Sequence, residues 1–298
     1  MVFFFGDGRL GNQIFQYAFL RSFFKNKKII SFSFIELFFL FKNLPNNFVI
    51  KIKNKYLKYL SNKILNLLFI FLSSLRVISS IKPLVKKIYS SDCELKKLIQ
   101  IKGFLPITFV YPYFFQSDFF YKTKTINKFK IKDEYILKAK NYISKYTFNS
   151  NSNNLEPIFV HIRRNDFKNL IVADKSNACL PFGYYLFAIN WFLKNVSNPF
   201  FIFLSDDKKY VKEKFNFLKN KIISYNNQYV DFCIISLCKY GIISNSSFSY
   251  WASSFIKEKK VIFAPKYWLG WRSKIEIHAG SLPYFAKAID PNRPYVFN

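Results

Sequence analysis

The chain of 298 residues is long enough for one large domain or two ordinary ones. Hydrophobic residues make up 51% and charged residues 21%, which excludes a disordered chain and a membrane protein of many helices. Lys and Arg number 46 against 17 Asp and Glu, so the net charge of +29 would attract a nucleic acid, an anionic lipid or a phosphorylated small molecule without choosing among them. The 39 Phe, the 20 Tyr and the abundant Lys are also the residues that A/T-rich codons encode. The positive charge therefore need not reflect a partner.

Neither a zinc site nor a membrane-spanning helix is expected. The four cysteines form no C-x-x-C pair and the chain has two histidines, so a reduced, cytoplasmic protein is the simplest expectation. No basic segment precedes the apolar residues at the start, which argues against a signal peptide. The charge-free apolar run at residues 64–75 is about 12 residues long, whereas a bilayer crossing needs about 20.

The first half begins with a predicted strand at residues 2–5, a turn and a helix at residues 13–24. The turn contains Gly6, Gly8 and Gly11 in a G-x-G-x-x-G spacing, and glycines let a ligand approach the backbone closely. This spacing alone is weak evidence for dinucleotide binding, because the acidic residue expected about 20 residues later is missing and Glu36 fits poorly. Residues 35–102 carry apolar helical blocks mixed with lysines, and no packing is predicted for them.

A polar Asn/Ser segment at residues 149–154 is the predicted boundary between domains of residues 1–150 and 151–298. After it, strands are predicted at residues 158–162, 200–204, 222–225, 241–244 and 261–264. Helices are predicted at residues 184–194, 208–219 and 230–239, and another begins at residue 248. Strands that alternate with helices of this length indicate right-handed βαβ units, a parallel sheet and an α/β fold.

Polar residues follow three of these strands. The clusters are His161, Arg163, Arg164 and Asp166, then Ser205, Asp206 and Asp207, then Asn245, Ser246 and Ser247. Ligands of open parallel sheets bind beyond the carboxyl ends of the strands, where helix N-termini point their N–H groups outward. We therefore expect the three clusters to lie at one edge of a sheet.

Two of the clusters suit a phosphate group. Adjacent arginines can donate paired, charge-assisted hydrogen bonds to a pyrophosphate; we expect Arg163 to face the ligand and Arg164 to serve a structural carboxylate. A surface pair of arginines would give the same sequence. SNSSFSYWA at residues 244–252 would form an anion cradle at a helix N-terminus, or only a well-capped helix.

A metal-independent reaction is expected, because the sequence has no Asp-x-Asp pair of the kind that holds a divalent ion against a diphosphate. Asp206 and Asp207 are adjacent, so in an extended segment their side chains point to opposite faces and would not chelate a metal together. Capping of the helix that begins at residue 208 is their alternative role.

Four motifs in this order resemble the bacterial α-1,2-fucosyltransferases of glycosyltransferase family 11. They are GRLGNQIFQYA at residues 8–18, HIRRND at 161–166, FLSDD at 203–207 and IISNSSFSYWAS at 242–253, with FFQSDFF at 114–120 and FAPKYW at 263–268 in support. The chain departs from that family at Asn165, where Gly is usual, at Asp118, where Glu is common, and at Tyr250, where Trp is usual. Asn tolerates left-handed backbone, so Asn165 would keep a glycine-like turn.

The resemblance implies a GT-B fold, with two Rossmann-like domains facing across a cleft and the nucleotide held mainly by the C-terminal one. Arg163 would bind the β-phosphate of GDP-fucose, and His161 would be a hydrogen-bonded scaffold residue. The donor-binding residues that it implies are Gly11, Asn12, His161, Arg163, Asp206, Asn245, Ser246 and Ser247.

The implied reaction moves L-fucose from GDP-fucose to the 2-hydroxyl of a galactoside. A β-linked donor and an α-linked product indicate one inverting displacement, in which Arg163 and the N–H groups around Ser246 and Ser247 would stabilise the charge on GDP. Asp166 is the first candidate for the base, and a salt bridge to an arginine is its alternative role.

Three other functions fit parts of the sequence: a fucosyltransferase of another linkage, a basic nucleic-acid-binding protein, and an inactive membrane-surface protein. The second does not account for three polar clusters on successive strands, so no nucleic-acid partner is expected. The lysines and apolar residues of 35–102 predict peripheral contact with an anionic inner membrane. The acceptor would be an oligosaccharide or a lipid-linked glycan.

Overall fold

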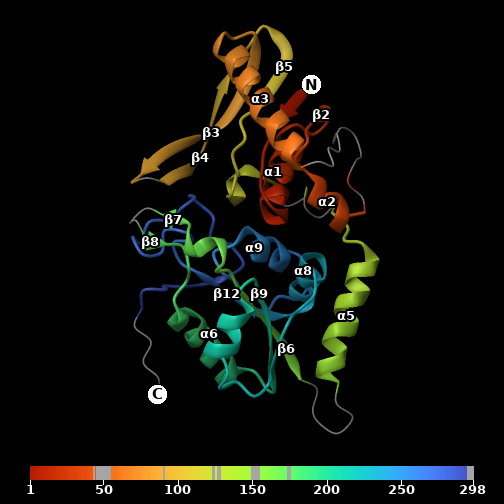
Figure 1. Cartoon of the computed structure of the whole chain (residues 1–298), viewed down its shortest axis with the longest axis vertical. Coiled ribbons are helices and arrows are strands. Elements are labelled where there is room, and N and C mark those ends of the chain that lie inside the picture. Colours follow the sequence, from red (N-terminus) through yellow and green to blue (C-terminus); the bar gives the residue numbers. More distant parts are fainter. Residues whose placement is uncertain are drawn as a thin grey trace. The chain divides into compact units, whose positions relative to one another are not determined.

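The computed structural model describes residues 1–42, 44, 55–89, 91–122, 125, 129–148, 155–172 and 176–293 (Figure 1). They group into two units, each built around its own mainly parallel sheet. The first unit comprises Met1–Lys86, Asp92–Lys132 and His278–Gly280, and the second comprises Lys87–Ser91, Asp133–Ile277 and Ser281–Asn298.

The first unit has, in its described residues, a five-stranded sheet with the order β2-β1-β5-β3-β4. Its strands are β1 (Val2–Phe4), β2 (Ile29–Ile30), β3 (Ile78–Ile88), β4 (Ser91–Ile101) and β5 (Leu105–Val110). β1 pairs in parallel with β2 and β5, and β3 pairs in parallel with β5. β4 returns beside β3 after a short turn, so the two form a hairpin at the sheet edge. The helices of this unit are α1 (Leu10–Phe23), α2 (Ile35–Leu40), α3 (Lys55–Ser74) and the short 3-10 helix η1 (Asp118–Phe120).

Aromatic side chains fill the core of the first unit. Phe19 on α1 is fully buried and stacks on Phe115, with ring centroids 4.0 Å apart. Phe69 on α3 lies 4.7 Å from Phe3 and 5.5 Å from Phe109, again between ring centroids. The many phenylalanines of this chain are therefore used in packing, where each buries a large apolar area.

The second unit has, within the part of the chain described, a six-stranded sheet with the order β10-β9-β6-β11-β12-β13. Its strands are β6 (Glu156–Ile162), β9 (Pro199–Ser205), β10 (Lys221–Ile223), β11 (Tyr240–Ile242), β12 (Val261–Pro265) and β13 (Lys287–Ile289). Every neighbouring pair of this sheet is parallel. Its helices are α5 (Asp133–Thr147), α6 (Phe182–Asn195), α7 (Lys208–Lys214), α8 (Gln228–Leu237), α9 (Ser247–Ser254) and the 3-10 helix η2 (Asp166–Lys168). A small antiparallel pair, β7 (Ile171–Val172) and β8 (Ser176–Asn177), lies outside the sheet.

Both faces of the second sheet are covered, as a parallel sheet with crossover helices requires. Ile158, Val160 and Ile162 of β6 pack in one apolar cluster that includes residues of α6 and β9. Gly241 in β11 faces the ring of Phe159: a Cβ at Gly241 would lie 2.1 Å from that ring. A side chain at this position would displace the Phe159 ring.

The predicted α/β class and the alternation of strands and helices after residue 155 are confirmed. The helix predicted at residues 208–219 ends earlier, at Lys214. The β3–β4 hairpin, α5 and β13 were not predicted. The β3–β4 strands carry lysines among their apolar residues, so their alternation is weak in the sequence.

The predicted linker at residues 149–154 lies outside the described residues, so the boundary between residues 1–150 and 151–298 stays a prediction. The structure does assign α5 to the second unit. α5 packs against α8, and the rings of Tyr135 and Tyr229 lie 5.3 Å apart.

Candidate functional site

The three polar clusters lie at one edge of the second sheet because their strands are neighbours. β6 lies between β9 and β11, with Ile162 paired to Ser205 and Val160 paired to Ile242. The strands are parallel, so the residues that follow them leave the sheet at the same, carboxyl edge. The expected convergence of the clusters is confirmed.

Arg163 follows β6 and is held by two carboxylates. Its Nη2 lies 2.7 Å from Oδ2 of Asp166, and its Nη1 lies 3.0 Å from Oδ2 of Asp206. The Arg163 side chain is 18% exposed, whereas that of Asp166 is 47% exposed. Asp166 therefore makes the salt bridge that was its alternative role, and the guanidinium of Arg163 lies partly open at the edge of the sheet.

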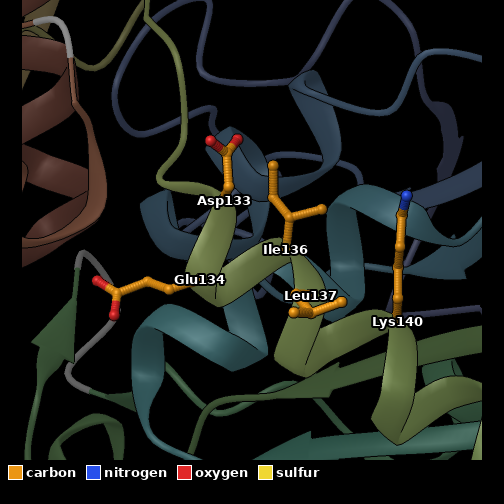
Figure 2. Close-up of a pocket in the computed structure, with 5 residues that line it drawn as sticks. All are labelled: Asp133, Glu134, Ile136, Leu137 and Lys140. Atoms are coloured by element: carbon orange, nitrogen blue, oxygen red, sulfur yellow. The ribbon is translucent and has the colours of Figure 1, made fainter.

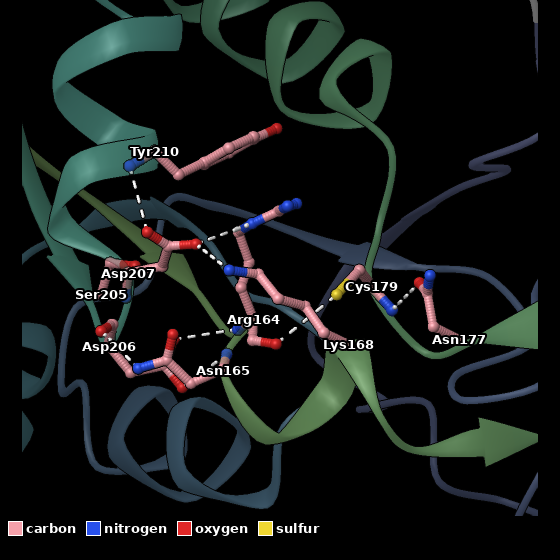
Figure 3. Close-up of polar contacts among 9 residues, drawn as sticks. All are labelled: Arg164, Asn165, Lys168, Asn177, Cys179, Ser205, Asp206, Asp207 and Tyr210. Carbon is pink, nitrogen blue, oxygen red and sulfur yellow. Dashed lines mark hydrogen bonds and ion pairs between the residues drawn. The ribbon is translucent and has the colours of Figure 1, made fainter.

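Asp206 holds the loop that carries Arg163 (Figure 3). Its Oδ1 accepts a hydrogen bond from the backbone N–H of Arg164 at 2.9 Å, and its Oδ2 accepts one from Asn165 N–H at 3.3 Å. The side-chain amide of Asn165 donates to the backbone carbonyl of Asp206 at 2.7 Å. Asn165 has φ −53° and ψ −64°, so the glycine-like left-handed turn predicted for it is wrong. A right-handed backbone, fixed by Asp206, takes its place.

Arg164 serves a structural carboxylate, as predicted (Figure 3). Its Nε lies 3.3 Å from Oδ2 of Asp207, and its guanidinium carbon lies 3.7 Å from the ring centroid of Tyr210. The other oxygen of Asp207 accepts the N–H of Tyr210 at 3.1 Å and caps α7. Burial would raise the pKa of Asp207, but the hydrogen bond from Lys168 at 2.8 Å, with Tyr210 N–H and Arg164, outweighs it and lowers that pKa. Asp206 thus holds the backbone of Arg164, whereas Asp207 pairs with its side chain and caps α7.

His161 is a buried scaffold residue at the end of β6. Its Nδ1 lies 2.8 Å from Oγ of Ser244, which links β6 to the segment after β11. Burial, assisted by the positive charge of Arg163, lowers the pKa of His161 to about 3. The imidazole is therefore neutral near pH 7 and adds no charge to the edge.

The segment after β11 leads directly into α9. Asn245 is 2% exposed, and its Nδ2 donates to the carbonyl of Ala178 at 2.8 Å. Its Oδ1 is buried and has no hydrogen-bond partner among the described residues. Ser246 is the N-cap of α9 but makes no side-chain cap hydrogen bond, unlike Asp207 on α7 and Asn227 on α8. The start of α9, where Ser247 is the first residue, is thus not the well-capped helix of the alternative interpretation.

Gly11 and Asn12 lie in the first turn of α1, in the first unit. The side-chain oxygen of Asn12 accepts a hydrogen bond from Nε2 of Gln116 at 2.9 Å. Gly8 has φ +128°, and a Cβ there would lie 2.7 Å from Cβ of Asn12. The positive φ and this close approach are the reasons that the turn before α1 has glycine at position 8.

Two carboxylates with defined partners were missed by the sequence analysis. Asp231, in the first turn of α8, lies 2.5 Å from Oγ of Ser224, just after β10 at the carboxyl edge of the second sheet. Burial raises the pKa of Asp231 to about 7 against the opposing effects of Ser224 and Lys208, and perturbed carboxyl groups are frequent at functional sites. The sequence did carry a signal for Asp231, because an acid in the first turn of a helix that follows a strand lies at the carboxyl edge of the sheet, where ligands bind.

Glu94 on β4 had no comparable signal. It is 1% exposed, and its carboxylate accepts the backbone N–H groups of Phe114 at 2.8 Å and Gln116 at 3.2 Å. It therefore fixes the FFQSDFF segment, from which Gln116 reaches Asn12. Only long-range pairing brings these residues together.

A surface hollow of about 380 Å³ lies on α5 and is lined by Asp133, Glu134, Ile136, Leu137 and Lys140 (Figure 2). None of these is a predicted site residue. Among the described residues, no group of three or more His, Cys, Asp or Glu side chains is arranged to hold a metal ion.

Comparison with known proteins gives the family and the fold. The model of glycosyl transferase family 11 matches residues 2–274. An alpha-1,2-colitosyltransferase of Escherichia coli is 38% identical over 101 residues, which cover 32% of this chain and 35% of that protein. The O-antigen biosynthesis glycosyltransferase WbnK of Escherichia coli is 29% identical over 123 residues, which cover 40% of this chain and 41% of that protein. The chain thus aligns with well under half the length of either relative.

Among solved structures, a glycosyl transferase of family 9 from Veillonella parvula is similar in fold, with a TM-score of 0.52 and 14% identity over 97% of this chain and 84% of that one. The NodZ alpha-1,6-fucosyltransferase crystallised with GDP has a TM-score of 0.49 and 10% identity, over 85% of this chain and 92% of that one. The two mainly parallel sheets of this chain and its likeness to the family 9 structure are those of the GT-B type of fold that the resemblance implied.

Proposed function

The chain belongs to glycosyl transferase family 11, and from this premise we propose that it transfers L-fucose from GDP-fucose to the 2-hydroxyl of a galactoside in a surface glycan, with inversion and without a metal. Family membership favours a transferase over the basic nucleic-acid-binding protein that the charge alone would also allow. The observation that carries the proposal is the carboxyl edge of the second sheet. There, Arg163 after β6 and the start of α9 after β11 follow neighbouring strands.

Arg163 is the proposed partner of the donor diphosphate. A guanidinium has five N–H donors. In the described residues, the ion pairs of Arg163 with Asp166 and Asp206 use one donor on each terminal nitrogen, so donors remain for a phosphate. Asp206 keeps the planar group oriented, which reduces the entropy lost when a phosphate binds.

The start of α9 supplies the second group of donors in this proposal. Backbone N–H groups in the first turn of a helix favour an anion, and the Ser246 side chain does not occupy them. As the bond between fucose and GDP breaks, negative charge grows on the leaving diphosphate. Arg163 and the N–H groups after Ser246 would stabilise that charge, and the loss of one such donor typically lowers the rate by about 100- to 1000-fold.

Asp166 is the proposed base that takes the proton of the acceptor hydroxyl. Its ion pair with Arg163 competes with this role, because a carboxylate that faces a guanidinium is a weaker base. The two roles predict different kinetics. If Asp166 is the base, Asp166→Asn lowers kcat and leaves KM for the donor nearly unchanged; if Asp166 only orients Arg163, KM for the donor rises.

A second donor deserves a direct comparison, because one relative is named for the transfer of colitose. Colitose lacks the 3-hydroxyl of fucose. A site that hydrogen-bonds this hydroxyl rejects the deoxy sugar strongly, whereas an apolar site does not. Parallel assays with the two GDP sugars would decide between the donors.

The test is transfer from GDP-fucose to a panel of galactosides, followed by linkage analysis of the product. Arg163→Ala should lower kcat/KM by about 100-fold or more with its circular dichroism unchanged. Arg21→Ala, which removes an arginine of the first unit, is the matched control and should keep normal turnover. Near-normal transfer by Arg163→Ala, or a product linked elsewhere than at the 2-hydroxyl, would contradict the corresponding part of the proposal.

A further inference from the structure

The outer face of α3 is apolar and exposed. Six large side chains on this face and at its C-terminal end are between 38% and 61% exposed: Leu60, Ile64, Leu67, Leu68, Phe71 and Leu75. At about 100° per residue, spacings of three and four place them on one side of the helix. Contiguous apolar patches of this kind on a soluble surface mark interaction sites.

The inner face of α3 packs Leu65, Phe69, Ile70 and Leu72 against the core of the first unit and also carries polar groups with fixed partners. Nδ2 of Asn62 donates to the carbonyl of Gly6 at 3.4 Å, and Nδ2 of Asn66 donates to the carbonyl of Phe5 at 3.0 Å. Ser73 is buried, and its hydroxyl lies 3.3 Å from that of Tyr111. This packing and these bonds fix the rotation of the helix, so α3 cannot turn its exposed apolar side chains toward the sheet without unpairing the amide N–H groups of Asn62 and Asn66 from their carbonyl partners.

The apolar face continues beyond the helix. Phe104 is 92% exposed, and its N–H donates to the carbonyl of Arg76 at 3.0 Å, which brings it next to the end of α3. An almost fully exposed phenylalanine beside Leu75 adds an aromatic ring at one end of the face. Phenylalanine and leucine are among the side chains that interfacial helices bury at a membrane surface.

The chain around α3 is strongly basic. Residues 37–91 contain ten Lys and Arg and no Asp or Glu. Lys63 on α3 is exposed, and Arg76 and Lys102 are exposed where the helix and Phe104 meet. An apolar strip with positive charge at its flanks matches the surface of a bilayer that contains anionic lipid.

We propose that this face of α3, extended by Phe104, docks the protein on an anionic membrane, with the helix parallel to the surface. The helix of 20 residues is about 30 Å long. None of the described helices is both long and apolar enough to cross a bilayer. A second copy of the chain is the weaker partner for this face, because two such faces would bring like charges together. The inference does not depend on the donor or the linkage proposed above.

Co-sedimentation with vesicles tests the proposal. The vesicles are equal parts phosphatidylcholine and phosphatidylglycerol, compared with phosphatidylcholine alone at the same low ionic strength. The triple variant Ile64→Gln, Leu67→Gln, Phe71→Gln should bind the anionic vesicles about 30-fold or more weakly, because it removes the strip from the interface. The control Leu137→Gln, Leu193→Gln, Phe217→Gln removes three exposed apolar side chains elsewhere and should bind like wild type.

The charge is tested separately from the apolar strip. Lys63→Gln and Lys102→Gln should each weaken binding to anionic vesicles by about fivefold and leave binding to neutral vesicles unchanged. Circular dichroism and urea unfolding confirm that every variant is folded.

A fluorescent probe reports the depth of the helix. The four native cysteines are buried, so a thiol introduced by Leu67→Cys can be labelled selectively with an environment-sensitive dye. Emission should shift to the blue on addition of anionic vesicles, and the same dye at Leu193→Cys should not respond. Equal binding of the wild type and the triple variant would overturn the proposal. So would a wild-type dimer that becomes monomeric in the triple variant while neither binds vesicles.

Discussion

Replacement of Asp206 by Ala tests how Arg163 is positioned. The carboxylate of Asp206 accepts two backbone N–H groups, those of Arg164 and Asn165, and pairs with the guanidinium of Arg163 at 3.0 Å. All of these contacts are lost at once in Asp206→Ala. The loop after β6 then keeps the bond from the Asn165 side chain to the backbone carbonyl of residue 206 and the pairing of Arg164 with Asp207, and neither contacts the Arg163 side chain.

The magnitude follows from the contacts. A hydrogen bond to a charged acceptor contributes about 1.5–3 kcal/mol, and an exposed ion pair contributes about 1 kcal/mol or less. The Asp206 side chain is 19% exposed, and the contact at 3.3 Å is long, so water replaces part of what is lost. We expect the free energy of unfolding to fall by about 2–4 kcal/mol. The kcat/KM for the donor should fall by about 100-fold, because Arg163 is no longer oriented.

Urea unfolding followed by circular dichroism measures the first effect, and donor saturation kinetics measure the second. Asp207→Ala is the matched control: it removes the cap of α7 and the contact with Arg164 but leaves both ion pairs of Arg163. Asp207→Ala should lower the free energy of unfolding, but it should alter the KM for the donor much less than Asp206→Ala does. The reasoning is refuted if Asp206→Ala loses stability but keeps wild-type donor kinetics, or if the two variants behave alike toward the donor.

Four further predictions concern three single residues and the use of a metal. Burial raises the pKa of Asp231 from 3.8 to about 7. Its contribution to the free energy of unfolding is therefore full below about pH 4 and is lost as the pH rises through 7. Asp231→Asn should remove this pH-dependent loss, which is on the order of 4 kcal/mol in urea unfolding. His161 acts in the opposite sense, because burial and Arg163 lower its pKa from 6.5 to about 3. Its contribution to the free energy of unfolding is full above pH 6.5 and is lost as the pH falls toward 3. In His161→Gln the free energy of unfolding should therefore depend less on pH in that range. Gly241→Ala should cost about 1–3 kcal/mol in thermal or urea unfolding, because the new Cβ meets the Phe159 ring. The absence of an Asp-x-Asp pair predicts equal rates of GDP release with excess EDTA and with added Mg²⁺ or Mn²⁺, and a large stimulation by either metal would contradict it.

Local patterns predicted most of the second unit. The apolar run at residues 158–162, followed by HIRRND, indicated a buried strand that ends in a polar loop, and β6 has this form. The first unit was harder because its patterns mislead. α3 carries large apolar side chains on both its outward and its inward face, so its pattern does not show which face meets the sheet. The lysines of β3 and β4 obscure the alternation of a strand.

The sequence by itself determined which residue types follow each strand, the excess of positive charge, the missing metal-binding pair and the motifs of the family. Only the tertiary structure decided which partner each side chain meets. Asp206 reaches Arg163 because β9 and β6 are neighbours in one register, and Asn245 is buried against Ala178, which lies far from it in the chain. Strand order and register arise from pairing between distant segments. The free energy of that pairing depends on the whole core, so no local pattern in the chain encodes it.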